Sequence, residues 1–360
     1  MPITKASGNA VAPAAKGDLV VGSATNDASV LTVGSNGTVL TADSTQTAGV
    51  KWAAAPSVTW TNRLRLSSIA INKIADNGSG TYVAVGNSGT LYSSTNGTTW
   101  TSRTSGFGSN TIYDVIFANN LWVAVGNNGT ITTSTDAITW TARTSGMSTN
   151  AIFQVVYANS LFVAVGNGGG ATNTGGITYS SDGITWTRKS QTTTMGTSYY
   201  SVAWNGTNWI VVGTTSTNNY IYASTPSGSW TSGNVASSAT FTSVIYDGTR
   251  IIASQDNNAV WYSTSSTFSS ATVYQSYVQD YGTAGGKSRY FYNGNLYTLL
   301  GTINKITTDS TAYPLSDYVS FNPSLVINTA GTNTFQGGCI WVGAAGYIVG
   351  TSEGAIFTSF

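Results

Sequence analysis

The sequence predicts an all-β protein: a seven-bladed β-propeller of four-stranded antiparallel blades, preceded by a short N-terminal β-rich segment that would anchor it. Three observations predict this fold. The composition favours short strands, one string recurs seven times, and the chain ends supply complementary parts of one blade. Of the 360 residues only 8% are charged and 41 are glycine, which is typical of many strands joined by tight turns.

The recurring string is Val83-Ala84-Val85-Gly86, which returns at 123–126 and again at 163–166. Four looser copies follow, beginning at Ile210, Ile251, Thr298 and Tyr347. A repeat of about 40 residues is the length of one propeller blade, and repeats of similar length also build solenoids. Seven copies therefore predict seven structural units.

Each copy contains four short runs of β-forming residues. In the copy that spans 111–143, turn signals separate the runs at 118–120, 126–129 and 135–137. This pattern predicts a four-stranded meander, which cannot bury both of its faces alone. Radial closure into a ring leaves no exposed end face, so a ring is favoured over a linear solenoid, which stays the alternative.

The two ends of the chain support closure. Residues 355–360 match the third strand of the first copy, at 90–94, so the last copy lacks a fourth strand. Residues 57–62 match the fourth strands of other copies and precede the first full copy. We expect 57–66 to complete the last blade, which divides the chain into an N-terminal segment, 1–56, and a propeller, 57–360.

Composition excludes several classes of function. The formal net charge is +1 and the 14 Lys and Arg form no run, so neither nucleic acid nor an anionic membrane is expected as a partner. The single cysteine, Cys339, excludes an internal disulfide framework. No stretch is long and apolar enough to span a bilayer, and the N-terminus lacks a signal-peptide pattern. With no histidine and no calcium-loop motif, we expect neither a metal nor a cofactor.

Another recurring pattern marks the turn before the fourth strand, at 94–100, 134–140 and 180–186. Each copy reads Ser, then Asn or Asp, then Thr-Trp, and it resembles the Asp-box repeat of sialidase-like propellers. The resemblance implies a structural role, with the carboxylate or amide accepting backbone N–H groups and the indole covering the blade junction. The residues that we assign to this structural repeat are Trp60, Trp100, Trp140, Trp186, Trp230, Asp136, Asp182 and Asp309.

A sialidase resemblance also implies three substrate arginines, a tyrosine nucleophile with a glutamate, and an acid. The chain has one glutamate, Glu353, and four of its seven arginines recur after the fourth-strand Trp, where a shared structural role is expected. A hydrolase that uses two carboxylates would have to draw on Asp280, Asp309 and Asp317 in the divergent sixth copy, where a turn role is favoured. We therefore expect no catalytic residues and no enzyme.

The first 56 residues differ from the repeats. Residues 17–22, 31–44 and 49–52 combine glycine-bounded apolar strands with a tight Ser-Asn-Gly turn. They resemble a module found near the N-termini of phage tail-fibre and other virion structural proteins, and a flexible linker is the alternative. A segment this short cannot form a stable core alone. We therefore expect it to pack on another copy of itself or on a partner.

The functional expectation is a bacteriophage appendage protein whose propeller recognises a host-surface glycan or protein, with residues 1–56 binding other virion proteins. It would be assembled in the host cytoplasm and exposed on the virion after lysis, in several copies, with a homo-oligomer left open. The alternatives are a purely structural virion component, such as a decoration or baseplate subunit, and a glycan hydrolase. The ligand-binding candidates are Tyr199, Tyr277, Tyr281 and Asn218, which lie in or beside long non-repetitive loops.

Overall fold

The structure is a computed structural model of the whole chain, which forms two compact units, Met1–Thr59 and Trp60–Phe360. Its described residues are 19–22, 28–31, 38–42, 45, 50–54, 61–66, 69–168, 176–189, 198–214, 219–235, 240–255, 260–275, 289–292, 296–300, 302–306, 320–321, 339–341, 347–350 and 355–358. Apart from one 3-10 turn, η1 (Asn127–Gly129), the regular structure of these residues is entirely β.

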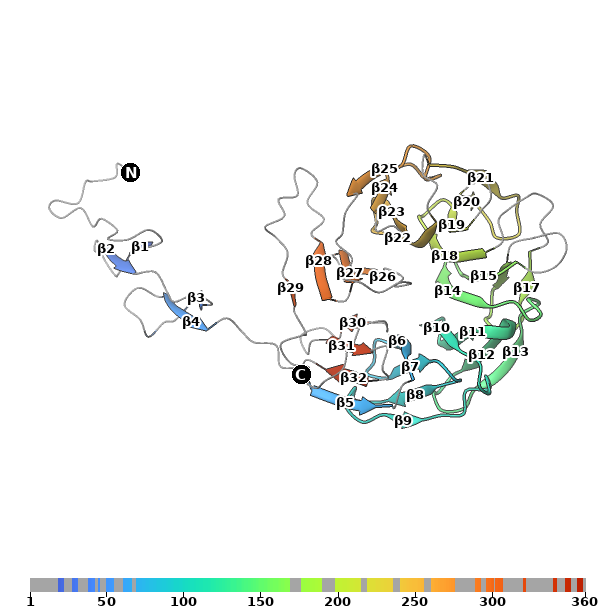
Figure 1. Cartoon of the computed structure of the whole chain (residues 1–360), viewed down its shortest axis with the longest axis horizontal. Helices are drawn as coiled ribbons and strands as arrows, with labels where there is room; N and C mark the ends of the chain where they lie inside the picture. Colours follow the sequence, from blue (N-terminus) through green and yellow to red (C-terminus); the bar gives the residue numbers. More distant parts are fainter. Residues whose placement is uncertain are drawn as a thin grey trace. The chain divides into compact units, whose positions relative to one another are not determined.

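The described residues of the second unit form seven four-stranded antiparallel sheets, and the first strand of each sheet lies nearest the centre of the ring in Figure 1. The first two sheets are β6 (Ile71–Asp76), β7 (Tyr82–Gly86), β8 (Leu91–Ser94), β9 (Thr101–Ser102) and β10 (Ile112–Ala118), β11 (Leu121–Gly126), β12 (Thr130–Ser134), β13 (Thr141–Thr144). The next two are β14 (Ile152–Ala158), β15 (Leu161–Gly166), β16 (Gly176–Ser180), β17 (Thr187–Arg188) and β18 (Ser198–Trp204), β19 (Trp209–Thr214), β20 (Tyr220–Ala223), β21 (Thr231–Gly233).

The remaining three sheets include the one that joins the chain ends. They are β22 (Phe241–Tyr246), β23 (Ile251–Gln255), β24 (Val260–Ser263), β25 (Thr272–Gln275); β26 (Arg289–Tyr292), β27 (Leu296–Leu300), β28 (Thr302–Ile306), β29 (Ser320–Phe321); and β30 (Cys339–Trp341), β31 (Tyr347–Gly350), β32 (Ala355–Thr358), β5 (Thr61–Arg65). The predicted seven-bladed propeller is confirmed.

The hydrophobic core lies between neighbouring blades, and the second-strand repeat explains why. In β11, Val123 and Val125 pack into the cluster shared with the third blade, whereas Ala124 packs into the cluster shared with the first. In β15, the valines likewise face the following blade and Ala164 faces the preceding one. Alternation along a strand thus sends successive side chains to opposite neighbouring blades, so each second strand contributes to two inter-blade clusters.

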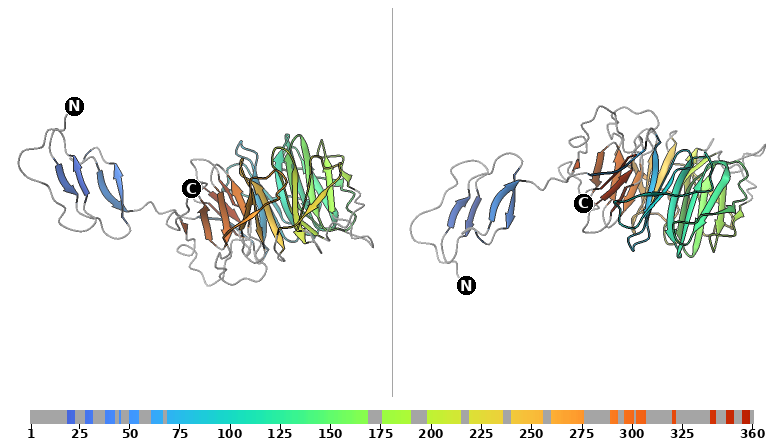
Figure 2. Two further views of the ribbon diagram at one scale, coloured as in Figure 1. Left: turned by 90° about the horizontal axis from the view of Figure 1, so that it is seen from above. Right: turned by 90° about the horizontal axis from the view of Figure 1, so that it is seen from below.

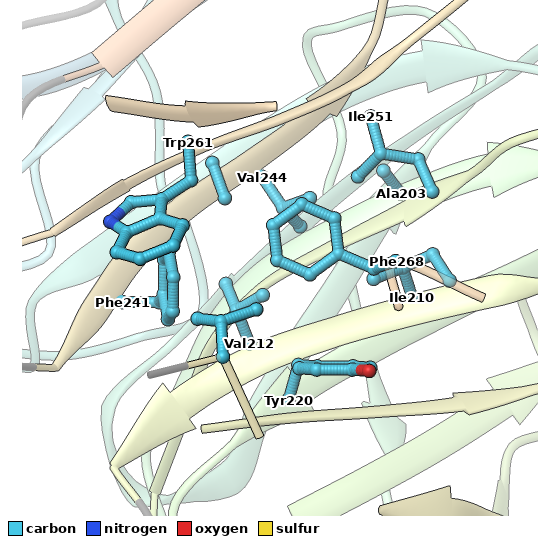
Figure 3. Packing of buried hydrophobic residues seen from close by; sticks show 11 residues of the cluster. Ala203, Ile210, Val212, Tyr220, Phe241, Val244, Ile251, Trp261 and Phe268 are labelled. Carbon is cyan, nitrogen blue, oxygen red and sulfur yellow. The ribbon is translucent and has the colours of Figure 1, made fainter. Parts of the chain in front are cut away.

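Aromatic side chains fill the junction between the fourth and fifth blades (Figure 3). Phe241 and Phe268 contact edge to face with 5.9 Å between ring centroids, and Tyr220 of the fourth blade meets Phe268 at 5.2 Å. Val212 and Val244 complete the same buried cluster. Both views of Figure 2 show the sheets of the propeller stacked side by side, as this packing requires.

The glycine that ends the second-strand string allows close backbone approach. A Cβ on Gly86, Gly126 or Gly166 would collide with the carbonyl oxygen just before the first strand of the same blade. The following asparagine donates its backbone N–H to that carbonyl, at 3.0 Å for Asn87 and 2.8 Å for Asn167. The Gly-Asn pair therefore fixes the start of the first strand against the end of the second.

The closing strand falls within the predicted range 57–66. β5 covers Thr61–Arg65 and pairs with β32 from Ala355↔Arg65 to Thr358↔Thr61. Residues 57–60 lie outside the described residues. Ile356 of β32 is fully buried in a cluster with Ile71 and Ile74 of the first blade, so the chain end contributes to the core.

The N-terminal unit contains two separate two-stranded antiparallel sheets. β1 (Leu19–Gly22) pairs with β2 (Ala28–Leu31), and β3 (Thr38–Ala42) pairs with β4 (Val50–Ala54). The predicted Ser-Asn-Gly turn at 35–37 lies outside the described residues. Isolated hairpins of this size are marginally stable in water, so the unit depends on further packing.

Removing residues 355–360 should destabilise the whole propeller, because β5 loses its partner and the first blade loses contact with Ile356. We expect one cooperative unfolding transition whose midpoint falls by about 5 °C or more in differential scanning calorimetry. A control that lacks residues 1–56 should keep the parental midpoint. A truncated chain that melts like the parent, or that loses only a small separate transition, would contradict ring closure.

Candidate functional site

Five consecutive blades contain a β-bulge at the same step of the first strand. In each, the pairing between the first and second strands skips one residue and then resumes. The skipped residues, which we call the bulge row, are Asn72, Tyr113, Phe153, Tyr200 and Thr242. Because a bulge redirects a side chain away from the regular alternation, this repetition indicates a built feature rather than a local irregularity.

The bulge row lies on the face that carries the second-to-third connections, which we call the loop face. The Asn72 amide donates to Asn87 Oδ1 at 3.0 Å, and the Tyr113 hydroxyl donates to Asn127 Oδ1 at 3.3 Å. Both acceptors directly follow the second strand of their blades. The turn face, at the other end of the strands, carries the first-to-second and third-to-fourth turns.

The three aromatic members of the row touch one another across blades. Phe153 lies between Tyr113 and Tyr200, with ring centroids 5.3 Å and 5.4 Å away, and the ring planes differ by 61° and 36°. All three side chains are partly exposed. Burial of its ring raises the pKa of the Tyr113 phenol above the ordinary value, so it stays neutral.

In three of these blades, the residue after the skipped position binds the next blade. Asp114 Oδ2 accepts the Val155 N–H at 3.1 Å, Gln154 Oε1 accepts the Val202 N–H at 2.7 Å, and Ser201 Oγ accepts the Val244 N–H at 3.0 Å. We call these three contacts the inter-blade bonds. The bulge thus presents one side chain at the loop face and directs the next one to the neighbouring blade.

Between the first and second blades, charged and amide groups make the equivalent connection. Lys73 Nζ lies 3.7 Å from Asp114 Oδ1, and the Asn72 amide donates to the Ile112 carbonyl at 2.9 Å. Asp114 is buried, whereas about a third of the Lys73 side chain is exposed. The two opposite charges compensate each other, so this part of the row carries no net charge.

The third-to-fourth turns have the geometry that their sequence predicts. In the third blade, Asp182 Oδ1 accepts the N–H groups of Ile184 and Thr185, each at 2.8 Å, and the Ser180 hydroxyl donates to the same oxygen. Asp136 makes the same contacts in the second blade. These hydrogen bonds lower the pKa of each carboxyl group to about 2, even though both groups are exposed.

The tryptophans of these turns are mostly buried. Trp100, Trp186 and Trp230 are each less than a tenth exposed. The indole N–H groups of Trp100 and Trp186 donate to the carbonyls of Gly97 and Gly183, at 3.0 Å and 2.9 Å.

Trp140 is the exception, and Trp60 and Asp309 lie outside the described residues. Trp140 is partly exposed, and its indole N–H has no partner among the described residues. Its turn has Ala137 at positive φ, where the turns of Trp100 and Trp186 have Gly97 and Gly183 in the same conformation. Trp140 still packs against the cluster between the first two blades, as expected for an indole at the blade junction.

Three of the four recurring arginines have the expected shared structural role. Arg63, Arg103 and Arg143 each donate Nε to a third-strand hydroxyl, on Thr358, Ser93 and Thr133 respectively, and each bond is 2.8 Å long. Arg188 does not share it, because it pairs with Thr178 one residue earlier in the strand and Lys189 takes the equivalent position. Arg250 lies in a first-to-second turn, where it pairs with Asp247 at 3.1 Å. None of these contacts resembles an arginine cluster arranged for a substrate.

One predicted ligand residue is misplaced. Tyr199 is 1% exposed and packs with Val163 and Trp209, so it cannot contact a ligand from solution. Burial raises the pKa of its phenol. Ile112, Ile152 and the other residues at this register are buried too, and it is the next residue, Tyr200, that the bulge brings to the loop face.

The other three ligand candidates, Tyr277, Tyr281 and Asn218, lie outside the described residues, as do Asp280, Asp309 and Asp317. Sequence reasoning missed Tyr113, Phe153 and Tyr200 as a group. Aligning the repeats at the start of the first strand would have found them, because each directly follows a buried large residue.

Within the described ranges, no three His, Cys, Asp or Glu side chains gather closely enough to hold a metal ion. No helix in those ranges is long and apolar enough to cross a bilayer.

The turn carboxylates should make stability depend on pH. Because their folded pKa of about 2 lies below the ordinary aspartate value, their contribution is present above about pH 4 and is lost as the pH falls toward 2. In a variant with both Asp136→Asn and Asp182→Asn, the melting temperature should fall less between pH 5 and pH 2 than in the parent. At pH 7 the two should melt alike, since Asn96 accepts the same two N–H groups in the first blade. Equal acid sensitivity would contradict this account.

The sequence matches no protein-family model and no curated protein. The solved structures that it resembles are β-propellers. YCF48 bound to a D1 peptide aligns with a TM-score of 0.61 and 14% identity, and the alignment covers 85% of this chain and 96% of that one. YCF48 from Cyanidioschyzon merolae aligns with a TM-score of 0.57 and 15% identity, and the alignment covers 83% of this chain and 98% of that one. Virginiamycin B lyase from Staphylococcus aureus aligns with a TM-score of 0.63, 10% identity, and coverage of 83% and 98%. At such low identities these likenesses show the β-propeller fold and nothing further.

Proposed function

We propose that this chain is a non-catalytic component of a bacteriophage appendage, whose propeller recognises a ligand on the host surface through its loop face. The observation that carries the proposal is the bulge row, in which one irregularity recurs in five blades and brings three aromatic rings together. A recurring bulge that leaves partly exposed rings on one face is typical of a contact surface.

The chemistry of this face favours binding over catalysis. The row offers aromatic rings, amides and hydroxyls, and the described charged groups beside it, Lys73 and Asp114, are paired with each other. General acid-base catalysis needs a titratable group poised to exchange a proton with a substrate. The row's aromatic rings, amides and hydroxyls are groups typical of a contact surface, which supports a binding role.

The virion assignment rests on the N-terminal unit and on the turns. The two hairpins of Met1–Thr59 form a unit separate from the propeller, as a module for attachment to other virion proteins would. The turn contacts of Asp136 and Asp182 suit the Asp-box resemblance, which sialidase-like propellers share with non-catalytic ones. Localisation on the virion, exposed after lysis, follows from this proposal.

A purely structural virion component is the second reading, and a glycan hydrolase is the third. A host protein is an alternative ligand, because one propeller of similar fold, YCF48, has been seen with a bound D1 peptide. The bulge row distinguishes these readings: a structural component does not need partly exposed rings on one face, and a hydrolase needs carboxylates there.

The test is adsorption of phage particles that carry variants of this chain. Phe153→Leu and Tyr200→Ala should reduce the adsorption rate to the host by about tenfold, since each removes a contact ring worth about 1 kcal/mol or more. Asn159→Ala, on a first-to-second turn of the turn face, should leave adsorption unchanged. Melting temperatures of the purified variants control for folding.

Two results would contradict the proposal. Normal adsorption by folded bulge-row variants, with the chain detected in purified particles by mass spectrometry, would favour the structural component. Absence of the chain from purified particles would reject the virion assignment altogether.

A further inference from the structure

We propose that the ligand of the bulge row is a neutral glycan chain, whose sugar rings stack on Tyr113, Phe153 and Tyr200. This inference rests on the proposed binding role of the loop face and names the chemical class that the face recognises. It does not depend on the assignment to a virion.

The spacing of the rings fits a chain of sugars. Phe153 lies 5.3 Å from Tyr113 and 5.4 Å from Tyr200, measured between ring centroids. This separation is comparable to the advance per residue along an extended glycan, so consecutive pyranose rings can each meet a different side chain. The apolar C–H face of a pyranose packs on an aromatic ring in the way that other apolar groups do.

Polar groups border the rings at the places where sugar hydroxyls would lie. The side-chain amides of Asn87 and Asn127 follow the second strands, and they already bond to Asn72 and to the Tyr113 hydroxyl. The Tyr200 hydroxyl similarly accepts from Thr214 at 3.4 Å. Amides and phenols can donate and accept at once, which suits hydroxyl groups of either orientation.

The charge of the surface selects a neutral ligand. Lys73 and Asp114 are the charged residues whose contacts involve the described row, and they form an ion pair at 3.7 Å. A sialylated or uronic-acid glycan would need an unpaired cation to compensate its carboxylate, because binding removes that carboxylate from water. The described row provides none.

The bulges disfavour an extended peptide as the ligand. A peptide that adds to a sheet pairs its backbone with a regular strand edge. In each of these first strands the bulge interrupts the regular spacing of backbone groups, which is a common way to prevent such pairing. The row therefore favours recognition through its side chains and disfavours pairing with a peptide backbone.

The experiment measures binding of the full chain to an array of neutral hexose, N-acetylhexosamine and deoxyhexose oligosaccharides, sialylated and uronic-acid oligosaccharides, and extended peptides. Hits are measured by titration calorimetry. We expect binding to neutral chains, with affinity about tenfold weaker in Phe153→Leu and Tyr113→Leu and largely retained in Phe153→Tyr.

The matched control is Tyr157→Leu. Tyr157 is also partly exposed and belongs to the same strand, β14, but it packs on Phe162 near the turn face, with 4.6 Å between centroids. Its loss should not change glycan affinity. Melting temperatures show whether any variant loses binding through unfolding, and Phe153→Tyr supplies a variant that keeps the ring.

Three outcomes would overturn the inference: binding restricted to acidic glycans or to peptides, no binding to any neutral chain, or neutral-glycan binding that Phe153→Leu and Tyr113→Leu leave unchanged. In the first two cases, adsorption that still depends on the row would preserve the proposed function while rejecting the glycan. Conversely, row-dependent glycan binding by a chain that is absent from virions would support the glycan and reject the phage role.

Discussion

The packing of one blade against the next is the constraint on which the rest of this structure depends. Each four-stranded sheet of the propeller has two apolar faces, and no α-helix covers them in the part of the chain that the structure describes. The second-strand string resolves this by placing valines on one face and alanine on the other, so that each blade fits its neighbour. The closing pair of β32 and β5 applies the same packing to the chain ends.

The bulge in the first strand adds polar specificity to this apolar packing. Hydrophobic contact between blades is not directional, whereas the inter-blade bonds fix how one first strand lies against the next. The acceptors are of three kinds, a carboxylate on Asp114, an amide on Gln154 and a hydroxyl on Ser201, and each accepts a backbone N–H from the following blade. A single extra residue in the first strand thus has two effects: it places a bulge-row side chain at the loop face, and it directs the next side chain to the neighbouring blade.

Much of the fold could be predicted from the sequence because it is repeated. The blade count, the four-strand pattern and the pairing of the chain ends follow from strings that recur at a regular period, and each of these features is observed. The turn hydrogen bonds of Asp136 and Asp182 followed from local sequence as well. Such features depend on short stretches of chain, where residue type decides conformation.

The candidate site was harder to predict because a bulge changes which side chains point outward. Strict alternation gives no reason to prefer Tyr200 over Tyr199, and the hypothesis chose the buried one. The extra residue is visible only when the paired strand is known, since it is defined by the register between β18 and β19.

The inter-blade bonds can be tested most directly by amide hydrogen exchange at Val202. Its N–H is bonded to Gln154 Oε1 and its side chain is 1% exposed, so it should exchange only through global unfolding in the parent chain. Gln154→Met keeps the side-chain volume but removes the acceptor. We expect it to speed exchange at Val202 and to lower the free energy of unfolding by about 1–3 kcal/mol, while the amides of β10 and β11 keep their protection relative to the new global stability. Rapid exchange of Val202 in the parent, or unchanged protection in the variant, would contradict the view that the bulges bind adjacent blades together.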